Sequence, residues 1–131
     1  MVKTATTAVI RRNGKILIAK RRRDGRWELP GGKVDPGESP ADCIRREIKE
    51  ELNLEVAIVR PLGEVEGIYR DIPMKVYAFL TDWTGGELSK NVHMNACWIE
   101  PEHLSEFDIV EEDRVVLEQL KEEGTREKDD S

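Results

Sequence analysis

The chain has 131 residues, of which 38% are apolar and 37% charged, and its formal net charge is −6. This length is enough for one domain with a real hydrophobic core. The acidic balance argues against nucleic-acid binding, because phosphate contacts need a basic surface. No apolar run approaches a membrane span and no signal peptide is evident, so we expect a cytoplasmic protein.

The chain has two cysteines, Cys43 and Cys97, which are far apart and lack the spacing of metal ligands. In a cytoplasmic protein such thiols stay reduced, which we favour over a disulfide.

The first elements surround an Asn-Gly pair. Residues 4–11 alternate weakly and are rich in Thr, Val and Ile, residues 15–20 alternate strictly, and Asn13-Gly14 lies between them. Two such runs around Asn-Gly predict a β-hairpin.

A short strand at residues 27–29 should then end at Pro30. Gly31 and Gly32 follow it, and they permit a close backbone approach that side chains would block.

The signals for a helix are clear between Ser39 and Asn53. Ser39 suits the N-cap, Pro40 the first helical position, and Asp42 completes a capping box. Apolar residues recur at helical spacing and should bury against a sheet; they are Ala41, Ile44, Ile48 and Leu52. Asn53 suits a left-handed helix stop, a place more often taken by Gly.

The second half of the chain predicts two strands, a closing strand and a second helix. The strands cover residues 55–66 and 74–82 with a break at 69–73, a turn follows at 84–86, and residues 97–99 close the sheet. A short helical turn is expected at 101–104 and a long helix at 110–120. We predict one domain over residues 1–121, a disordered charged tail over 122–131, and an α+β or α/β sandwich.

The segment from Gly32 to Leu54 resembles the Nudix box. That box reads Gly, five residues, Glu, seven residues, then Arg-Glu-apolar-x-Glu-Glu-x-Gly-apolar. The matching residues are Gly32, Glu38, Arg46, Glu47, Ile48, Glu50, Glu51 and Leu54. One position departs, because Asn53 stands where the family has Gly. The flanking segments WELPGGK and CWIEPEHL make the chain similar to the MutT-like subgroup over about residues 4–120.

The resemblance implies an α/β/α sandwich with a mixed central sheet, a Nudix helix and a C-terminal helix. It also implies an Mg²⁺-dependent hydrolase, with Mn²⁺ as a substitute. The favoured substrate is a (d)NTP, oxidised or modified ones included, cleaved to the monophosphate and pyrophosphate. The alternatives are ADP-ribose, an NDP-sugar or a dinucleoside polyphosphate, or a non-catalytic domain that senses a nucleotide. The expected partner is therefore a small nucleotide, with monomer and homodimer both open.

The glutamates of the box have a chemical explanation of their own. Glu47, Glu50 and Glu51 share one helix face, where like charges repel. Mg²⁺ prefers carboxylate oxygens, so a cation would turn this repulsion into binding. The alternative is a solvated helix with salt bridges, but Glu47 and Glu51 form a like-charge pair that stability alone would not favour.

The resemblance also assigns roles to residues of the box. It implies that the Gly32 carbonyl and the carboxylates of Glu47, Glu50 and Glu51 bind the metal. Glu38 and Arg46 would orient those carboxylates through bidentate bonds. The reaction would then depend on the set Glu50, Glu47, Arg46 and Glu38.

The general base is less evident. Relatives carry a glutamate in the loop before a Trp equivalent to Trp98, yet no carboxylate occurs here between Glu87 and Trp98. His93 is a candidate, since an imidazole suits proton transfer near neutral pH. A solvated loop histidine is the more common case, so we favour Glu50 or Glu47 as the base.

The substrate contacts follow from position in the resemblance. Arg21 and Lys33 match phosphate-binding positions, although Lys33 could equally be an ordinary surface lysine. Asp113 matches a residue that faces the nucleobase. Asp113 could equally interact with the dipole of the final helix. Leu29 and Tyr69 are candidate pocket walls, with burial in the core as the alternative.

Overall fold

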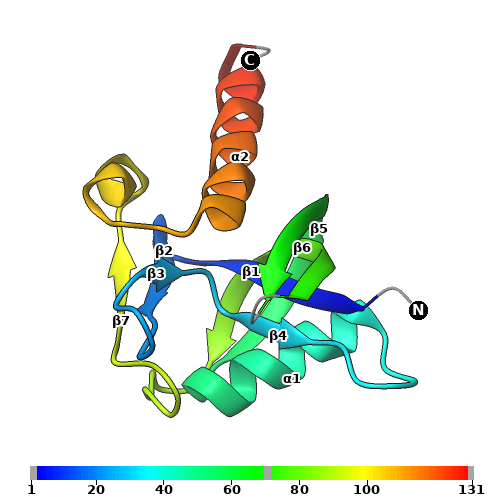
Figure 1. Cartoon of the computed structure of the whole chain (residues 1–131). Helices are drawn as coiled ribbons and strands as arrows, with labels where there is room; N and C mark the ends of the chain where they lie inside the picture. Colours follow the sequence, from blue (N-terminus) through cyan, green and yellow to red (C-terminus); the bar gives the residue numbers. More distant parts are fainter. Residues whose placement is uncertain (1–2, 70–71, 130–131) are drawn as a thin grey trace.

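The computed structural model describes residues 3–69 and 72–129, with side chains described for 3–68 and 72–121. In chain order the elements are β1 (Thr4–Arg12), β2 (Lys15–Lys20), β3 (Trp27–Glu28), β4 (Gly31–Lys33), α1 (Pro40–Leu52), β5 (Glu55–Tyr69), β6 (Ile72–Gly85), β7 (Asn95–Ile99), the 3-10 helix η1 (Pro101–Glu106) and α2 (Glu111–Asp129). The sheet lies between α1 on one face and α2 on the other (Figure 1). The expected sandwich with a mixed sheet is therefore confirmed.

Strand β1 organises the sheet. The strand order is β3-β2-β1-β6-β5, with β4 also paired to β1 and β7 to β2. Strands β1 and β6 run parallel, whereas the other pairs are antiparallel. Near its turn β1 pairs with β2, where Arg11 lies opposite Ile16, and farther back it pairs with β4, where Thr6 lies opposite Gly32. The two strands of the hairpin thus separate, and β4 takes the vacated edge.

The predicted hairpin turn is confirmed. Asn13 and Gly14 have φ values of 52° and 79°. Both positions lie in the left-handed region that a two-residue hairpin turn of this type requires.

Each face of the sheet carries its own hydrophobic core. On one face Ile44, Ile48 and Leu52 of α1 pack against Ala8 and Ile10 of β1. Successive residues of a strand point to opposite faces, so Val9 of β1 joins the core that includes Val116 of α2. Burying one such branched side chain contributes about 1.5–3 kcal/mol.

Helix α1 begins and ends where the sequence predicts. The Ser39 hydroxyl accepts the Asp42 amide at 3.1 Å, which satisfies one of the free donors of the first turn. Asn53 adopts the left-handed conformation with φ 59°, and its amide donates to the Lys49 carbonyl at 3.0 Å. Asn thus fills the place that Gly takes in the family.

The structure contains more strand than the sequence predicts, since β4 was not predicted and β5, β6 and β7 are longer than predicted. Strands β5 and β6 remain paired as far as Tyr69 and Ile72, because each supplies the hydrogen-bond partners of the other. Helix α2 is assigned over Glu111–Asp129, and the predicted disorder of residues 122–131 stays a prediction. Within the described residues, no helix is long and apolar enough to cross a membrane.

Candidate active site

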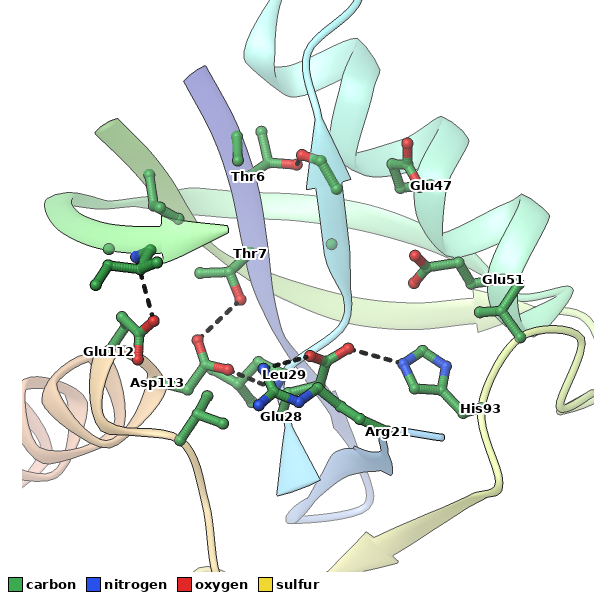
Figure 2. Close-up of a pocket in the computed structure, with 18 of the residues that line it drawn as sticks. Thr6, Thr7, Arg21, Glu28, Leu29, Glu47, Glu51, His93, Glu112 and Asp113 are labelled. Atoms are coloured by element: carbon green, nitrogen blue, oxygen red, sulfur yellow. Dashed lines mark hydrogen bonds and ion pairs between the residues drawn. The ribbon is translucent and has the colours of Figure 1, made fainter. Parts of the chain in front are cut away.

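A cavity of about 490 Å³ lies between β1, the β3–β4 segment, α1 and the start of α2. Its volume falls in the range of small-molecule sites. Carboxylates and arginines both line it: Glu28, Glu47, Glu50, Glu51, Glu112 and Asp113, with Arg21, Arg22 and Arg23. Glu47 and Glu51 project from α1 at one side, and Asp113 lies on the other beside Thr7 (Figure 2). The carboxylates of α1 and the Asp113 carboxylate therefore line the same cavity.

The glycine pair allows α1 to approach the sheet. A Cβ atom on Gly31 would overlap the backbone of Thr6, and one on Gly32 would lie 2.6 Å from Glu47 Oε2. Real Cβ atoms do not approach other atoms so closely. Gly31 therefore requires glycine because its neighbour is backbone, whereas at Gly32 the absence of a side chain lets the Glu47 carboxylate lie directly against β4.

Arg46 forms ion pairs with four carboxylates, those of Asp35, Glu38, Glu47 and Glu50. Its Nε and Nη2 atoms donate to Glu38 at 2.7 and 2.9 Å, and its Nη1 donates to Glu47 at 2.9 Å and to Glu50 at 3.2 Å. The hydrogen bonds from Arg46 lower the pKa of Glu38 to about 2 and raise the pKa of Arg46 itself. Charge-assisted bidentate pairs of this kind restrict both side chains. Arg46 therefore orients the carboxylates of Glu47 and Glu50.

Glu51 is the most deeply buried carboxylate of the box. Burial, followed by the nearby charges of Glu47 and Glu28, raises its pKa to about 8. Burial also raises the pKa of Glu47, against the opposing effect of Arg46. Glu51 Oε2 is buried and has no hydrogen-bond partner among the described residues. An unpartnered buried oxygen beside other carboxylates fits a divalent cation, which would supply the missing positive charge.

The carboxylate oxygens of Glu47, Glu50 and Glu51 are not close enough to one another in this structure to coordinate one metal ion together. Among the described residues, three ligand atoms lie within 4.8 Å of one another only at Glu100, Glu102 and His103, which are exposed. In the box, the Arg46 guanidinium already pairs with Glu47 and Glu50. The donor set therefore fits a cation in chemistry, and these side chains would have to adjust to hold it.

The Gly32 carbonyl, the other predicted ligand, accepts the Thr6 hydroxyl at 3.2 Å. The Cys43 thiol also donates to it, at 3.7 Å. Burial raises the pKa of Cys43 to about 11, so this thiol stays protonated. Cys43 and Cys97 are not joined by a disulfide.

Glu28 and His93 form a pair that the sequence did not indicate. His93 Nε2 lies 2.9 Å from Glu28 Oε2, and Arg21 Nη1 lies 3.7 Å from Glu28 Oε1 (Figure 2). His93 is 4% exposed, so it is not a solvated loop residue. Its Nδ1 is buried without a partner in the described part of the chain, which favours the tautomer with the proton on Nε2. His93 then donates to Glu28.

Arg21 lines the cavity, yet its guanidinium is already paired. It forms a two-pronged ion pair with Asp24 in addition to its contact with Glu28. Arg22 and Arg23 also line the cavity. The predicted phosphate residue Lys33 is exposed and is not part of the cavity lining within the described residues.

Asp113 is buried where α2 meets the sheet. Its Oδ2 accepts the Leu29 amide at 2.9 Å, and its Oδ1 accepts the Thr7 hydroxyl at 3.4 Å. Burial raises its pKa to about 7, and the charges of Glu28 and Glu112 act in the same direction. The Leu29 side chain is buried, while the residue contributes to the cavity wall. Asp113 thus connects α2, β1 and the segment before the glycine pair.

Two further residues complete the description of the cavity. Glu112 accepts the Ile68 amide at 3.3 Å and lies against Gly67, so it closes one rim. The sequence offered no signal for Glu112 beyond its place next to Asp113. The side chain of Tyr69, a predicted pocket wall, lies outside the described residues.

The chain is similar to known proteins over most of its length. The family model described as NUDIX domain matches residues 1–120. A Mycobacterium tuberculosis protein provisionally named 8-oxo-dGTP diphosphatase 2 is 37% identical over 107 residues, which cover 76% of this chain and 74% of that protein. The CTP pyrophosphohydrolase of Escherichia coli is 30% identical over 115 residues and 85% of each chain. The crystal structure of a MutT NUDIX hydrolase from Burkholderia pseudomallei superposes with a TM-score of 0.82 at 30% identity, covering 91% of this chain and 98% of that one.

Proposed function

Since the chain belongs to the Nudix family of hydrolases, we propose that it cleaves nucleoside triphosphates to the monophosphate and pyrophosphate with the help of Mg²⁺. The observation that carries this proposal is that different chemical groups line the two sides of the cavity. A buried carboxylate with an unpartnered oxygen, Glu51, lies at one side, and Asp113 lies at the other. The names of two relatives, an 8-oxo-dGTP diphosphatase and a CTP pyrophosphohydrolase, point to the same substrate class.

The box carboxylates would hold the metal. Glu51, Glu47 and Glu50 supply the oxygens that Mg²⁺ prefers, with the Gly32 carbonyl as a fourth candidate. When bound there, the cation neutralises phosphate oxygens and activates the attacking water. Arg46 keeps Glu47 and Glu50 in place, and Glu38 in turn holds Arg46.

The chemistry is the attack of water on a phosphorus atom of the triphosphate. The new bond joins the water oxygen to phosphorus, the bridging P–O bond breaks, and pyrophosphate leaves. Glu50 is suited to accept the proton of the attacking water, because it lines the cavity and its side chain is 59% exposed. His93 suits that role less, since Nε2 is bonded to Glu28 and Nδ1 is buried. Arg22 and Arg23 supply positive charge for the phosphate chain.

The opposite side of the cavity would read the nucleobase. Glu28 and Asp113 are hydrogen-bond acceptors when ionised, and Asp113 becomes a donor as well when protonated. Acceptors at this place favour a base with an exocyclic amine, such as cytosine or guanine, over uracil or thymine. An oxidised guanine carries a further N–H donor and fits the same groups.

A substrate screen tests the proposal. Wild type and Glu50→Gln would be incubated with Mg²⁺ and canonical or oxidised (d)NTPs, NDP-sugars, ADP-ribose and dinucleoside polyphosphates. Glu106→Gln, an exposed glutamate far from the cavity, is the control. We expect pyrophosphate release from triphosphates that Glu50→Gln loses and Glu106→Gln keeps. Faster turnover of NDP-sugars or ADP-ribose would overturn the substrate class, and nucleotide binding without turnover would indicate a sensor.

A further inference from the structure

The segment between β6 and β7, residues 86–94, lies against the last turn of α1; we call it the β6–β7 loop. The last carbonyls of any helix lack partners within the helix. In α1 the loop supplies these partners. The Ser89 amide donates to the Leu52 carbonyl at 2.9 Å, and the Asn91 amide donates to the Glu51 carbonyl at 3.1 Å.

Asn91 makes a second bond to the same turn. Its side-chain Nδ2 donates to the Glu50 carbonyl at 2.8 Å. The Ser89 hydroxyl donates to Asn91 Oδ1 at 2.8 Å, which directs the amide nitrogen toward the helix. One residue of the loop therefore holds the backbone of both Glu50 and Glu51.

Asn53, at the C-terminal end of α1, also contacts the β6–β7 loop. Asn53 Nδ2 donates to the Glu87 carbonyl at 3.2 Å, a bond that glycine at this position could not make. Gly86 has φ 85°, and a Cβ there would overlap the Asn53 carbonyl. The departure from the family glycine at Asn53 thus adds a contact to the β6–β7 loop.

The other end of the loop is anchored at the cavity. The Met94 amide donates to the Lys20 carbonyl at 2.9 Å, and Arg22 Nε donates to the Val92 carbonyl at 3.1 Å. His93 follows directly and contacts Glu28. The loop therefore joins the last turn of α1 to the Glu28–His93 pair.

We propose that Asn91 is a positioning residue, which sets the carboxylates of Glu50 and Glu51 for the metal by holding their backbone. Helix ends fray, and a cation that binds a frayed turn must first order it. Both hydrogen bonds of Asn91 oppose this fraying at the two residues concerned. The proposal rests on the proposed metal-dependent function, and its metal-binding part can be measured without turnover.

The test compares Asn91→Ala with Lys90→Ala, an exposed neighbour in the same loop. Mn²⁺ binding without substrate is measured by titration calorimetry, and the unfolding temperature is recorded for each protein. Loss of one hydrogen bond to an oriented group should weaken Mn²⁺ binding by about fivefold in Asn91→Ala. Lys90→Ala should bind as wild type does. With an active substrate, kcat should fall about tenfold in Asn91→Ala, with KM within twofold of wild type.

A second variant covers the case in which Asn91→Ala does not fold. Ser89→Ala keeps every backbone bond and removes only the hydroxyl that directs the Asn91 amide, so a twofold to threefold loss of Mn²⁺ affinity is expected. The proposal is overturned if a folded Asn91→Ala, or Ser89→Ala in its place, binds Mn²⁺ as wild type does. An inactive wild type that still shows these differences in Mn²⁺ binding would count against the proposed function alone.

Discussion

Arg46 holds Glu38 by two parallel hydrogen bonds, at 2.7 and 2.9 Å, and contacts Glu47 and Glu50 through its remaining nitrogen. Glu38 therefore acts on the box through Arg46. Glu38→Gln keeps the shape but loses the charge that anchors the guanidinium. Such outer partners of metal ligands typically contribute 10- to 100-fold to affinity or activity. We expect an increase of that size in the Mg²⁺ concentration for half-maximal activity, measured by steady-state kinetics.

The control for this change is Glu106→Gln, which removes an exposed carboxylate of η1. Its Mg²⁺ dependence should match that of wild type. A Glu38→Gln protein with unchanged Mg²⁺ dependence would show that Arg46 keeps its position without Glu38.

Glu51 predicts a pH effect on the metal-free protein. Burial raises its pKa to about 8, well above that of an unfolded glutamate. A raised carboxyl pKa stabilises the fold below the unfolded pKa, and this contribution is lost as the pH rises through about 8. Without metal, the unfolding temperature of the wild-type protein should therefore fall between pH 7 and 8. The unfolding temperature of Glu51→Gln should fall less over the same range.

Addition of Mg²⁺ should reverse the loss in wild type, because the cation compensates the buried charge. Glu51→Gln should gain little from Mg²⁺. Differential scanning fluorimetry at pH 7 and 8, with Mg²⁺ or EDTA, makes this comparison. Equal responses of the two proteins to Mg²⁺ would contradict a role of Glu51 in binding it.

Asp113 should change the stability of the fold at a lower pH than Glu51 does. Its pKa of about 7 means that the fold is most stable when this group is protonated, and stability falls as the pH rises from about 4 to 7. Asp113→Asn removes this contribution and retains an oxygen that can accept the Leu29 amide. The unfolding temperature of the variant, relative to wild type, should rise from pH 5 to pH 8. A constant difference over that range would show that Asp113 does not titrate there.

Glu28 should influence the choice of base. Glu28→Gln replaces an acceptor with a group that also donates, so the preference for amine-bearing bases should weaken. We expect the ratio of kcat/KM for dCTP over dUTP to fall about tenfold, the size of one discriminating hydrogen bond. Glu112→Gln, a change at the rim, is the matched control and should leave the ratio within twofold. An unchanged ratio in Glu28→Gln would remove Glu28 from recognition.

Local signals in the sequence were sufficient to predict the bounds of α1. Ser39, Pro40 and Asn53 mark the helix ends through contacts within a few residues, and the spacing of the box glutamates carries the family. Contacts between distant segments were not predictable in this way. Glu28 and His93 are 65 positions apart, and their contact depends on β3 and β7 both pairing with β2.

The same reason applies to the residues that we predicted to contact the substrate. Asp113 reaches the Leu29 amide across 84 positions, so its two internal bonds were not visible in the sequence. Lys33 belongs to a three-residue strand, and spacing alone does not show on which side of so short an element a side chain lies. Arg22 and Arg23 follow Arg21 in the chain, and the fold places both at the cavity.

The two glycines before the box should respond differently to alanine. In Gly31→Ala the new methyl group would overlap the backbone of Thr6, which cannot move without disturbing β1. In Gly32→Ala it would meet the Glu47 side chain, which can rotate away. We therefore expect Gly31→Ala to lose about 1–3 kcal/mol of unfolding free energy. Gly32→Ala should keep most of its stability but bind Mn²⁺ at least tenfold more weakly, because Glu47 is displaced.

Chemical denaturation and Mn²⁺ titration of both variants separate the two effects. Gly37→Ala is a control for the introduced methyl group: no atom lies within 4 Å of its would-be Cβ, although its φ of 80° adds local strain. That strain should lower stability without changing Mn²⁺ affinity. If Gly32→Ala binds Mn²⁺ as tightly as Gly37→Ala does, the position of Glu47 against β4 is not needed for the metal.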